Sequence, residues 1–180
     1  NPRHEGFLEC MRNTFCPALH ARSFVTVISL VHVACFILSM AGSIVAYEGL
    51  STSRFLGANP RLLMMFNKNN YEMQHGQLWR FVTPTLLHNS FGHVVQNLIT
   101  LLIFGSMLEG MVGFKHTALL YLASGVGGNL FSALCQDTNS VGASTAVCGI
   151  LAGCLAMIIA NWKAFDGNQQ LEQTRCILLF

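Results

Sequence analysis

The stretch TNSVGASTAVCGILAGCLAMIIANW, residues 138–162, contains no aspartate, glutamate, lysine or arginine. Three more charge-free windows lie at residues 23–47, 81–108 and 116–136. Each can hold the roughly 20 apolar residues that cross a lipid bilayer. The whole chain of 180 residues is 52% hydrophobic and only 10% charged, whereas soluble domains average about 25% charged residues. The sequence therefore predicts an all-α bundle of transmembrane helices.

Within these windows we expect four spans, at residues 24–46, 90–108, 117–134 and 141–162. The last three are joined by short connections, so neighbouring helices should pack antiparallel. The chain ends on the apolar string CILLF, which predicts the start of a fifth span. Residue 1 is asparagine rather than methionine, and we expect the chain to be a fragment at both ends.

Residues 1–22 are mixed polar and predict an N-terminal cytosolic segment, followed by a membrane domain over residues 23–180 that is incomplete at its C-terminus. The distribution of lysine and arginine weakly favours this orientation. The first span follows more than twenty polar residues, unlike a signal peptide. The N-terminal segment also lacks the arginine and serine of a mitochondrial transit peptide. We therefore expect a multi-pass protein of the secretory pathway or plasma membrane.

Charge and cysteine content exclude two classes. The net charge is only +2 and no cluster of lysine or arginine occurs, so a nucleic-acid partner is not expected. The seven cysteines form no C-x-x-C pair, so neither a disulfide framework nor a zinc site is indicated.

The connection at residues 48–87 is far longer than the roughly two to eight residues usual between packed helices. Its apolar run RLLMMF at residues 61–66 is too short to cross a bilayer. We expect this run to lie in the membrane interface, with Tyr71 and Trp79 at headgroup depth. A mobile loop in water is the alternative, but it would expose leucine, methionine and phenylalanine.

Polar residues occur near the start of the second predicted span. His93 and Asn97 are four residues apart, so on a helix they share one face. Polar groups at this depth are costly unless they face a cavity or a partner. They could donate hydrogen bonds to an oxyanion, or they could hold two helices together, and the sequence leaves both open. A lone His32 in the first span is interpreted as a structural partner of a neighbouring helix.

Ser144 is expected at the first turn of the last span. Unpaired backbone N–H groups and the positive end of the helix dipole lie at such a position, and an attacking oxygen would use both. Ser144 could equally be one small residue in a packing seam, because Gly149 and Gly153 have the spacing that lets two helices approach closely.

Five features occur in a fixed order along the chain: Trp79-Arg80; His88, His93 and Asn97; GSMLE at residues 105–109; YLASGVGGN at residues 121–129; and Gly142-Ala143-Ser144. In this combination the chain resembles the rhomboid family of intramembrane serine proteases. The resemblance implies a rhomboid-like bundle that cuts single-span transmembrane proteins within the lipid bilayer, without a cofactor or metal. It implies that Ser144 is the nucleophile and that His93 and Asn97 complete an oxyanion hole with the serine N–H. It assigns structural roles to the remaining matched residues, which are His88, Trp79, Arg80, Glu109 and Gly142.

The chain departs from the family pattern at three points. Thr145 follows the serine where the family usually has glycine, and a β-branched residue resists angles that glycine takes freely. Cys148 stands where the family often has tyrosine or phenylalanine. The resemblance also implies a catalytic histidine in a sixth span, whereas no histidine follows His116. We expect that histidine beyond residue 180.

Two hypotheses follow. The first is a serine endopeptidase of the rhomboid type. The second is a catalytically inactive relative that binds and sorts transmembrane helices; Thr145 and Cys148 favour it, whereas the retained Ser144, His93 and Asn97 argue against it. A channel or transporter would need polar residues through several spans, and residues 24–46 and 117–134 are nearly free of them.

Overall fold

The computed structural model describes residues 20–165, and within that range it consists of helices and their connections, without a β-strand. Three helical segments are long and apolar enough to cross a membrane. They are α2 (Phe24–Tyr47), the segment Phe91–Val112, and α7 (Phe114–Cys135). The predicted all-α membrane bundle is therefore confirmed.

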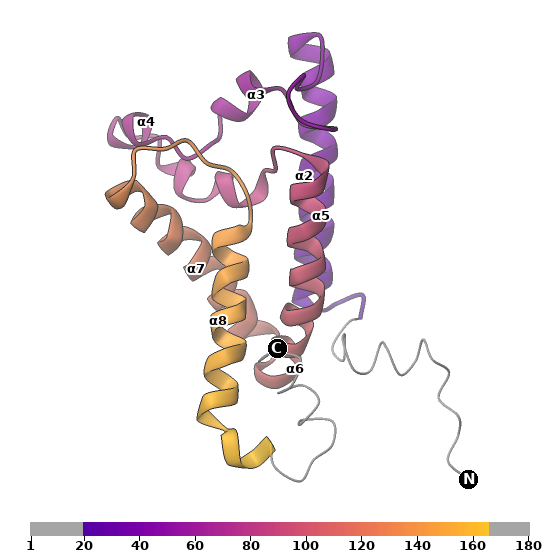
Figure 1. Cartoon of the computed structure of the whole chain (residues 1–180), viewed down its shortest axis with the longest axis vertical. Coiled ribbons are helices and arrows are strands. Elements are labelled where there is room, and N and C mark those ends of the chain that lie inside the picture. Colours follow the sequence, from indigo (N-terminus) through magenta and orange to yellow (C-terminus); the bar gives the residue numbers. More distant parts are fainter. Residues whose placement is uncertain (1–19, 166–180) are drawn as a thin grey trace, which may run out of the picture.

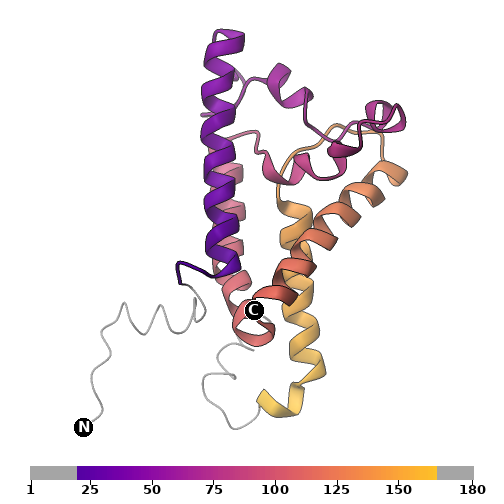
Figure 2. The ribbon, with the colours of Figure 1, turned by 180° about the vertical axis from the view of Figure 1, so that it is seen from behind.

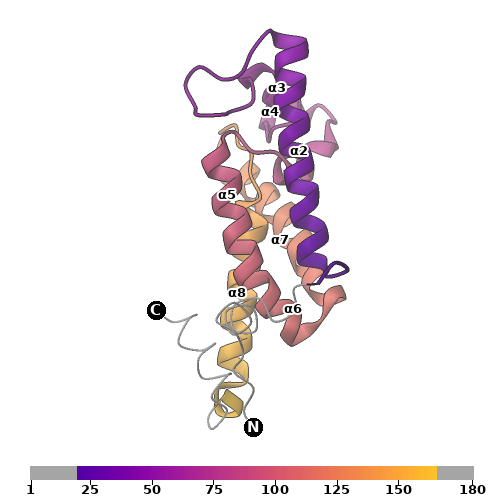
Figure 3. The same cartoon turned by 90° about the vertical axis from the view of Figure 1, so that its right-hand side faces the viewer.

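The segment Phe91–Val112 is built from three pieces: α5 (Phe91–Thr100), the π-helical turn η3 (Leu101–Gly105) and α6 (Ser106–Val112). Figure 3 shows α2 and α5 running alongside each other, with α6 at their lower end. The contact is close at Gly105, where an added Cβ would lie 2.9 Å from Cγ2 of Val25. A glycine at this point lets the second span approach α2.

The fourth predicted span is present as α8 (Ser144–Ala160), an apolar helix of 17 residues that is shorter than the other three segments. It begins three residues later than predicted because Gly142 has φ +138°, which a helix does not accommodate. In Figure 1 the chain before α8 runs down from about the level of α4, and α8 starts below the upper ends of α2 and α5. The predicted fifth span and most of the N-terminal segment lie outside the described residues.

Helices α7 and α8 pack through small residues. Gly149 of α8 lies so close to Ser124 of α7 that an added Cβ would overlap the serine side chain. In the other direction, a Cβ on Gly128 of α7 would lie 2.8 Å from Cβ of Thr145. Figure 2 shows the two helices crossing obliquely, as close backbone approach allows. This seam fixes the position of the first turn of α8.

The long connection lies across one end of the bundle (Figure 1). It contains α3 (Pro60–Met64), α4 (Asn70–Gln74) and two 3-10 turns, η1 (Leu78–Phe81) and η2 (Thr83–Leu86). Leu63 and Met73 are buried beneath it, whereas Phe66, Tyr71 and Trp79 are exposed. The connection is therefore structured, and its placement in the membrane interface stays a prediction.

Candidate active site

Ser144 is the first residue of α8 and its side chain is exposed. Its hydroxyl makes no hydrogen bond with any residue between 20 and 165. No side chain caps the N-terminus of the helix, so the positive end of the dipole and the N–H groups of the first turn are not neutralised there. A reactive oxygen at this position has the electrostatic surroundings that favour negative charge.

Gly142 shapes the backbone that enters this turn. Its N–H donates to the carbonyl oxygen of Pro84 at 2.8 Å. A Cβ at Gly142 would lie 2.5 Å from Cε1 of His93, and φ is positive, so glycine is required both by conformation and by space. The His93 ring therefore packs directly against the residue two positions before Ser144.

His93 is held from α5 and from the turn that precedes it. Ser90 caps the helix by accepting from the His93 backbone N–H at 3.4 Å. The ring Nδ1 lies 3.2 Å from Oδ1 of Asn89. With this pairing Nδ1–H is the donor, so Nε2 can also donate only when the ring is protonated. A role for His93 in binding an oxyanion thus requires the imidazolium form.

Asn97 lies one turn along α5 from His93 and is 8% exposed. Its Nδ2 is buried and has no hydrogen-bond partner among the described residues. Four residues of α5 rise about 6 Å, so Asn97 lies that far along the helix from His93, whose ring touches Gly142. The alternative role as a link between helices predicts a side-chain hydrogen bond across α5 and α8, and none is found for His93 or Asn97 in residues 20–165.

His88 lies behind this site and is fully buried. Its Nε2 accepts a hydrogen bond from the Ala143 N–H at 3.5 Å. Burial, followed by the charges that His32 and His93 carry when protonated, lowers the pKa of His88 to about 3. The ring is therefore neutral and able to accept this bond.

A row of rings continues from His88 into the bundle. The His88 ring centroid lies 5.2 Å from that of His93 and 5.3 Å from that of His32. Nε2 of His32, in turn, is 2.6 Å from the Tyr121 hydroxyl of α7. The structural interpretation of His32 as a partner of a neighbouring helix is confirmed, although Tyr121 was not recognised from the sequence.

Two charged residues singled out from the sequence bind backbone groups far along the chain. Nη1 of Arg80 donates to the carbonyl oxygens of Asn67 at 2.7 Å and Met64 at 3.0 Å. The carboxylate of Glu109 accepts from the first two N–H groups of α2, those of Phe24 at 2.8 Å and Val25 at 3.0 Å. An acidic group at this helix end also complements the dipole. Trp79, next to Arg80, is half-exposed.

Lys68 is a residue that sequence reasoning missed. It is fully buried, and its Nζ donates to three carbonyl oxygens around the end of α7, those of Ser132 at 3.2 Å, Gln136 at 2.7 Å and Thr138 at 3.0 Å. Its backbone also pairs with Ser140 in an isolated antiparallel bridge. Lys68 thereby ties the long connection to the segment that leads into α8. No pattern in the sequence pairs these two segments.

Comparison with known proteins shows which family the sequence matches. The sequence model of the Rhomboid domain matches residues 75–179. Rhomboid-like protease 2 of Toxoplasma gondii is 32% identical over 168 residues, which cover 92% of this chain and 57% of that protein.

The chain belongs to the rhomboid family.

RHOMBOID-like protein 5 of Arabidopsis thaliana is another rhomboid relative, 30% identical over 91% of this chain and 56% of its own length. Rhomboid protease GluP of Bacillus subtilis (strain 168) is 34% identical over 59% of this chain and 21% of its own length. The chain spans about half the length of the first two relatives. It is thus an integral membrane protein of a family that includes intramembrane proteases.

The two departures of the candidate site from the family pattern do not disrupt the backbone. Thr145 lies within α8 and packs against Gly128, so it has helical angles that threonine accepts. Cys148 is exposed one turn after Ser144. No cluster of three or more histidine, cysteine, aspartate or glutamate residues in the described part of this rhomboid could hold a metal ion.

Proposed function

We propose that this rhomboid is an intramembrane serine endopeptidase that cleaves transmembrane helices of single-span membrane proteins, with Ser144 as the nucleophile. Two observations together carry the proposal: Ser144 is exposed at an uncapped helix start, and Nδ2 of Asn97 is buried without a partner among the described residues. A buried donor without a partner calls for a ligand. An oxyanion that forms during the reaction is such a ligand.

The proposed reaction follows from these positions. Ser144 Oγ attacks the carbonyl carbon of the scissile bond, and its proton passes to a histidine that the proposal places beyond residue 180. The carbonyl oxygen becomes negative and accepts hydrogen bonds from Asn97 Nδ2 and the Ser144 N–H, and also from His93 Nε2 in those molecules whose His93 ring is protonated. The amine then leaves with the histidine's proton, and water hydrolyses the acyl-enzyme.

The depth of α8 supports a substrate that lies in the membrane. The helix starts below the upper ends of α2 and α5 (Figure 1), so its first residue lies within the height of the bundle. The exposed side of Ser144 leaves room for a partner helix. We further propose a secretory-pathway or plasma membrane, although one relative is named RHOMBOID-like protein 6, mitochondrial. Imaging of the tagged full-length protein against organelle markers tests this location.

The nucleophile is tested with a fluorophosphonate probe on the full-length protein in detergent. We expect covalent labelling that Ser144→Ala removes and Ser53→Ala, at an exposed serine in the long connection, retains. In parallel, the wild type should cleave a single-span substrate. Labelling that survives Ser144→Ala would exclude this serine. Binding of transmembrane helices without labelling or cleavage would instead support an inactive relative.

The oxyanion assignment predicts a second effect. Asn97→Ala should lower kcat by about a hundredfold with little change in KM, because the lost hydrogen bond forms only in the transition state. His93→Ala should lower kcat on the same scale when the wild-type ring is protonated, and progressively less as pH rises. Steady-state kinetics of the folded variants across pH measure both effects. Unchanged kcat in both variants would leave the two residues with a packing role only.

A further inference from the structure

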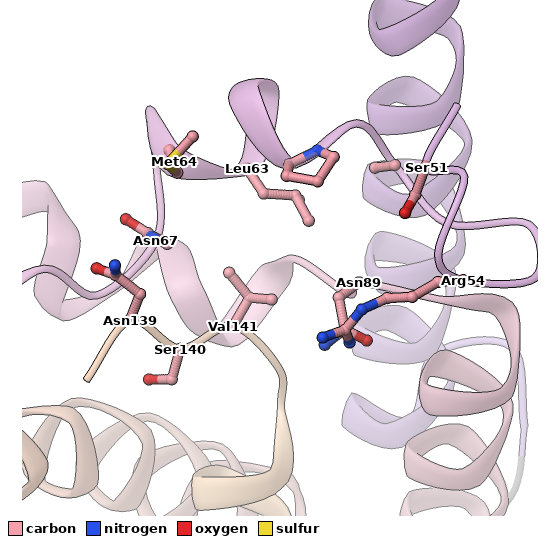
Figure 4. A pocket seen from close by; sticks show the side chains of 11 residues that line it. Ser51, Arg54, Leu63, Met64, Asn67, Asn89, Asn139, Ser140 and Val141 are labelled. Carbon is pink, nitrogen blue, oxygen red and sulfur yellow. The ribbon is translucent and has the colours of Figure 1, made fainter. Parts of the chain in front are cut away.

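A cavity of about 340 Å³ lies between the long connection and the segment that leads into α8. Figure 4 shows its labelled side chains, which come from residues 51–67, from Asn89 and from residues 139–141. The polar part of the lining consists of Ser51, Arg54, Asn67, Asn89, Asn139 and Ser140. None of its lining residues is acidic. The cavity therefore carries one formal charge, the positive charge of Arg54.

The three asparagines of this lining have amide oxygens that already face a partner and NH2 groups that donate to no group in the described part of the chain. Oδ1 of Asn67 accepts from Arg80 at 2.9 Å, and Oδ1 of Asn139 accepts from Asn69 at 3.0 Å. Oδ1 of Asn89 faces Nδ1 of His93 at 3.2 Å. Each amide oxygen is thus engaged outside the cavity, and the NH2 groups remain to bind a ligand.

Arg54 is held next to these donors. Its loop closes through the hydrogen bond from Ser51 N–H to the Gly57 carbonyl oxygen at 2.9 Å. Gly57 approaches the Asn89 carbonyl so closely that an added Cβ would lie 2.5 Å from that oxygen and 3.0 Å from Cβ of Arg54. Figure 4 shows the Arg54 side chain pointing toward Asn89. Arg54 forms no hydrogen bond or ion pair within the described part of the chain.

We propose that this cavity, named here the Arg54 pocket, binds the carboxylate of an aspartate or glutamate side chain in the substrate segment next to the cut bond. The guanidinium fork and amide NH2 groups match the planar geometry of a carboxylate. The proposal rests on the proposed protease function and adds a preference for an acidic residue.

The position of the pocket limits where that acidic residue lies. Ser140 lines the pocket and Ser144 is four residues further along. Four residues of chain span at most about 14 Å. An extended substrate whose carbonyl is at Ser144 therefore reaches the pocket within roughly five residues of the cut bond. The preference for an acidic residue should therefore hold at one substrate position. It should not follow the net charge of the whole substrate segment.

The test measures binding separately from cleavage. Full-length Ser144→Ala protein in neutral detergent is titrated with fluorescent single-span peptides, in which one glutamate is moved through the residues flanking the span against an all-glutamine parent. At one position we expect glutamate to bind about tenfold more tightly than glutamine, on the scale of a charge-assisted hydrogen bond discounted for the exposure of Arg54. The preference should shrink at high salt.

Three variants make the test specific. In the same background, Arg54→Gln should remove the glutamate preference and Arg54→Glu should reverse it toward lysine. Arg61→Gln, at an exposed arginine of the same connection that does not line the pocket, should leave it intact. Glutamate and glutamine affinities within twofold of each other at every position would overturn the proposal.

Two further outcomes can be distinguished from the proposed role of the pocket. Anionic lipid vesicles that bind wild-type protein more tightly than Arg54→Gln, with no glutamate preference, would assign the pocket to a lipid phosphate and overturn the proposal. Cleavage of the peptides by wild-type protein reports the protease function independently. If wild-type protein does not cleave the peptides but the glutamate preference is observed, the proposed protease function is contradicted and the pocket assignment stands.

Discussion

The seam between α7 and α8 and the long connection at residues 48–87 are held in different ways. The seam is made by shape, because Gly149 receives Ser124 and Gly128 receives Thr145. The connection is held by buried polar side chains that bind backbone carbonyls far along the chain, as Lys68 does. Membrane helices satisfy their own backbone groups and need only fit together. Irregular backbone needs donors from elsewhere.

The largest effect should come from Lys68→Met, which keeps the length of the side chain and removes its three hydrogen bonds. The carbonyl oxygen of Thr138 then loses the one donor that the described residues give it, whereas those of Ser132 and Gln136 keep the Gln136 N–H and Asn70 Nδ2. We expect the free energy of unfolding to fall by about 3 kcal/mol, the scale for breaking buried hydrogen bonds to a charged group. Denaturant unfolding of the full-length protein in micelles measures this loss.

Lys115→Met is the matched control, because Lys115 is exposed on α7. It should change the free energy of unfolding by less than about 0.5 kcal/mol. Equal losses in the two variants would show that burial of Lys68 does not hold the connection, and the contrast with the seam would then fail.

The substitution Gly149→Ala tests the packing of the seam. The added methyl group overlaps Ser124, and overpacking of this kind costs about 2 kcal/mol. Ser124→Gly in the same protein should recover part of the loss, giving a coupling energy of about 1 kcal/mol in a double-mutant cycle. Gly127→Ala serves as control, since nothing lies within 4 Å of its added Cβ. Additive effects would mean that the two helices do not touch at this point.

The smallest effect, counted per pH unit, is a pH dependence where the connection meets the bundle. His88 has an unfolded pKa near 6.5 and a folded pKa of about 3. Below pH 6.5 the unfolded chain binds a proton that the folded chain does not, so its contribution to stability is greatest above pH 6.5 and falls toward pH 3. We expect a loss of about 1 kcal/mol per pH unit in this window. His88→Gln should reduce the slope of the unfolding free energy against pH, and an unchanged slope would exclude His88 as a cause.

Helix positions were largely predictable, because charge-free windows and bilayer thickness define them. The first span was predicted at residues 24–46 and is observed as Phe24–Tyr47. The third was predicted from residue 117 and begins at Phe114, because Gly113 ends α6 with φ +79° and the exposed Lys115 fits within a helix. The late start of α8 depends on Gly142, whose backbone angle is set by contacts with Pro84 and His93.

The candidate site was also predictable only in part. Residue types and spacing singled out Ser144, His93 and Asn97 as candidates, because a serine at a helix start and two polar residues four apart in an apolar helix stand out locally. Their roles as nucleophile and oxyanion donors came from the resemblance to the rhomboid family and stay a proposal. The pairing of His93 Nδ1 with Asn89 and the contact of the His93 ring with Gly142 could not be predicted, because each joins or orients side chains through the packing of α5 against the chain before α8.

The sequence by itself determined that this protein is a membrane helix bundle and which polar residues stand apart from its apolar spans, since hydropathy and spacing are local properties. Only the tertiary structure decided that Lys68 binds the end of α7, that Asn97 keeps a buried donor unpaired, and that three asparagines line one cavity with Arg54. Those outcomes depend on which backbone and side-chain groups the packed helices bring within hydrogen-bond distance.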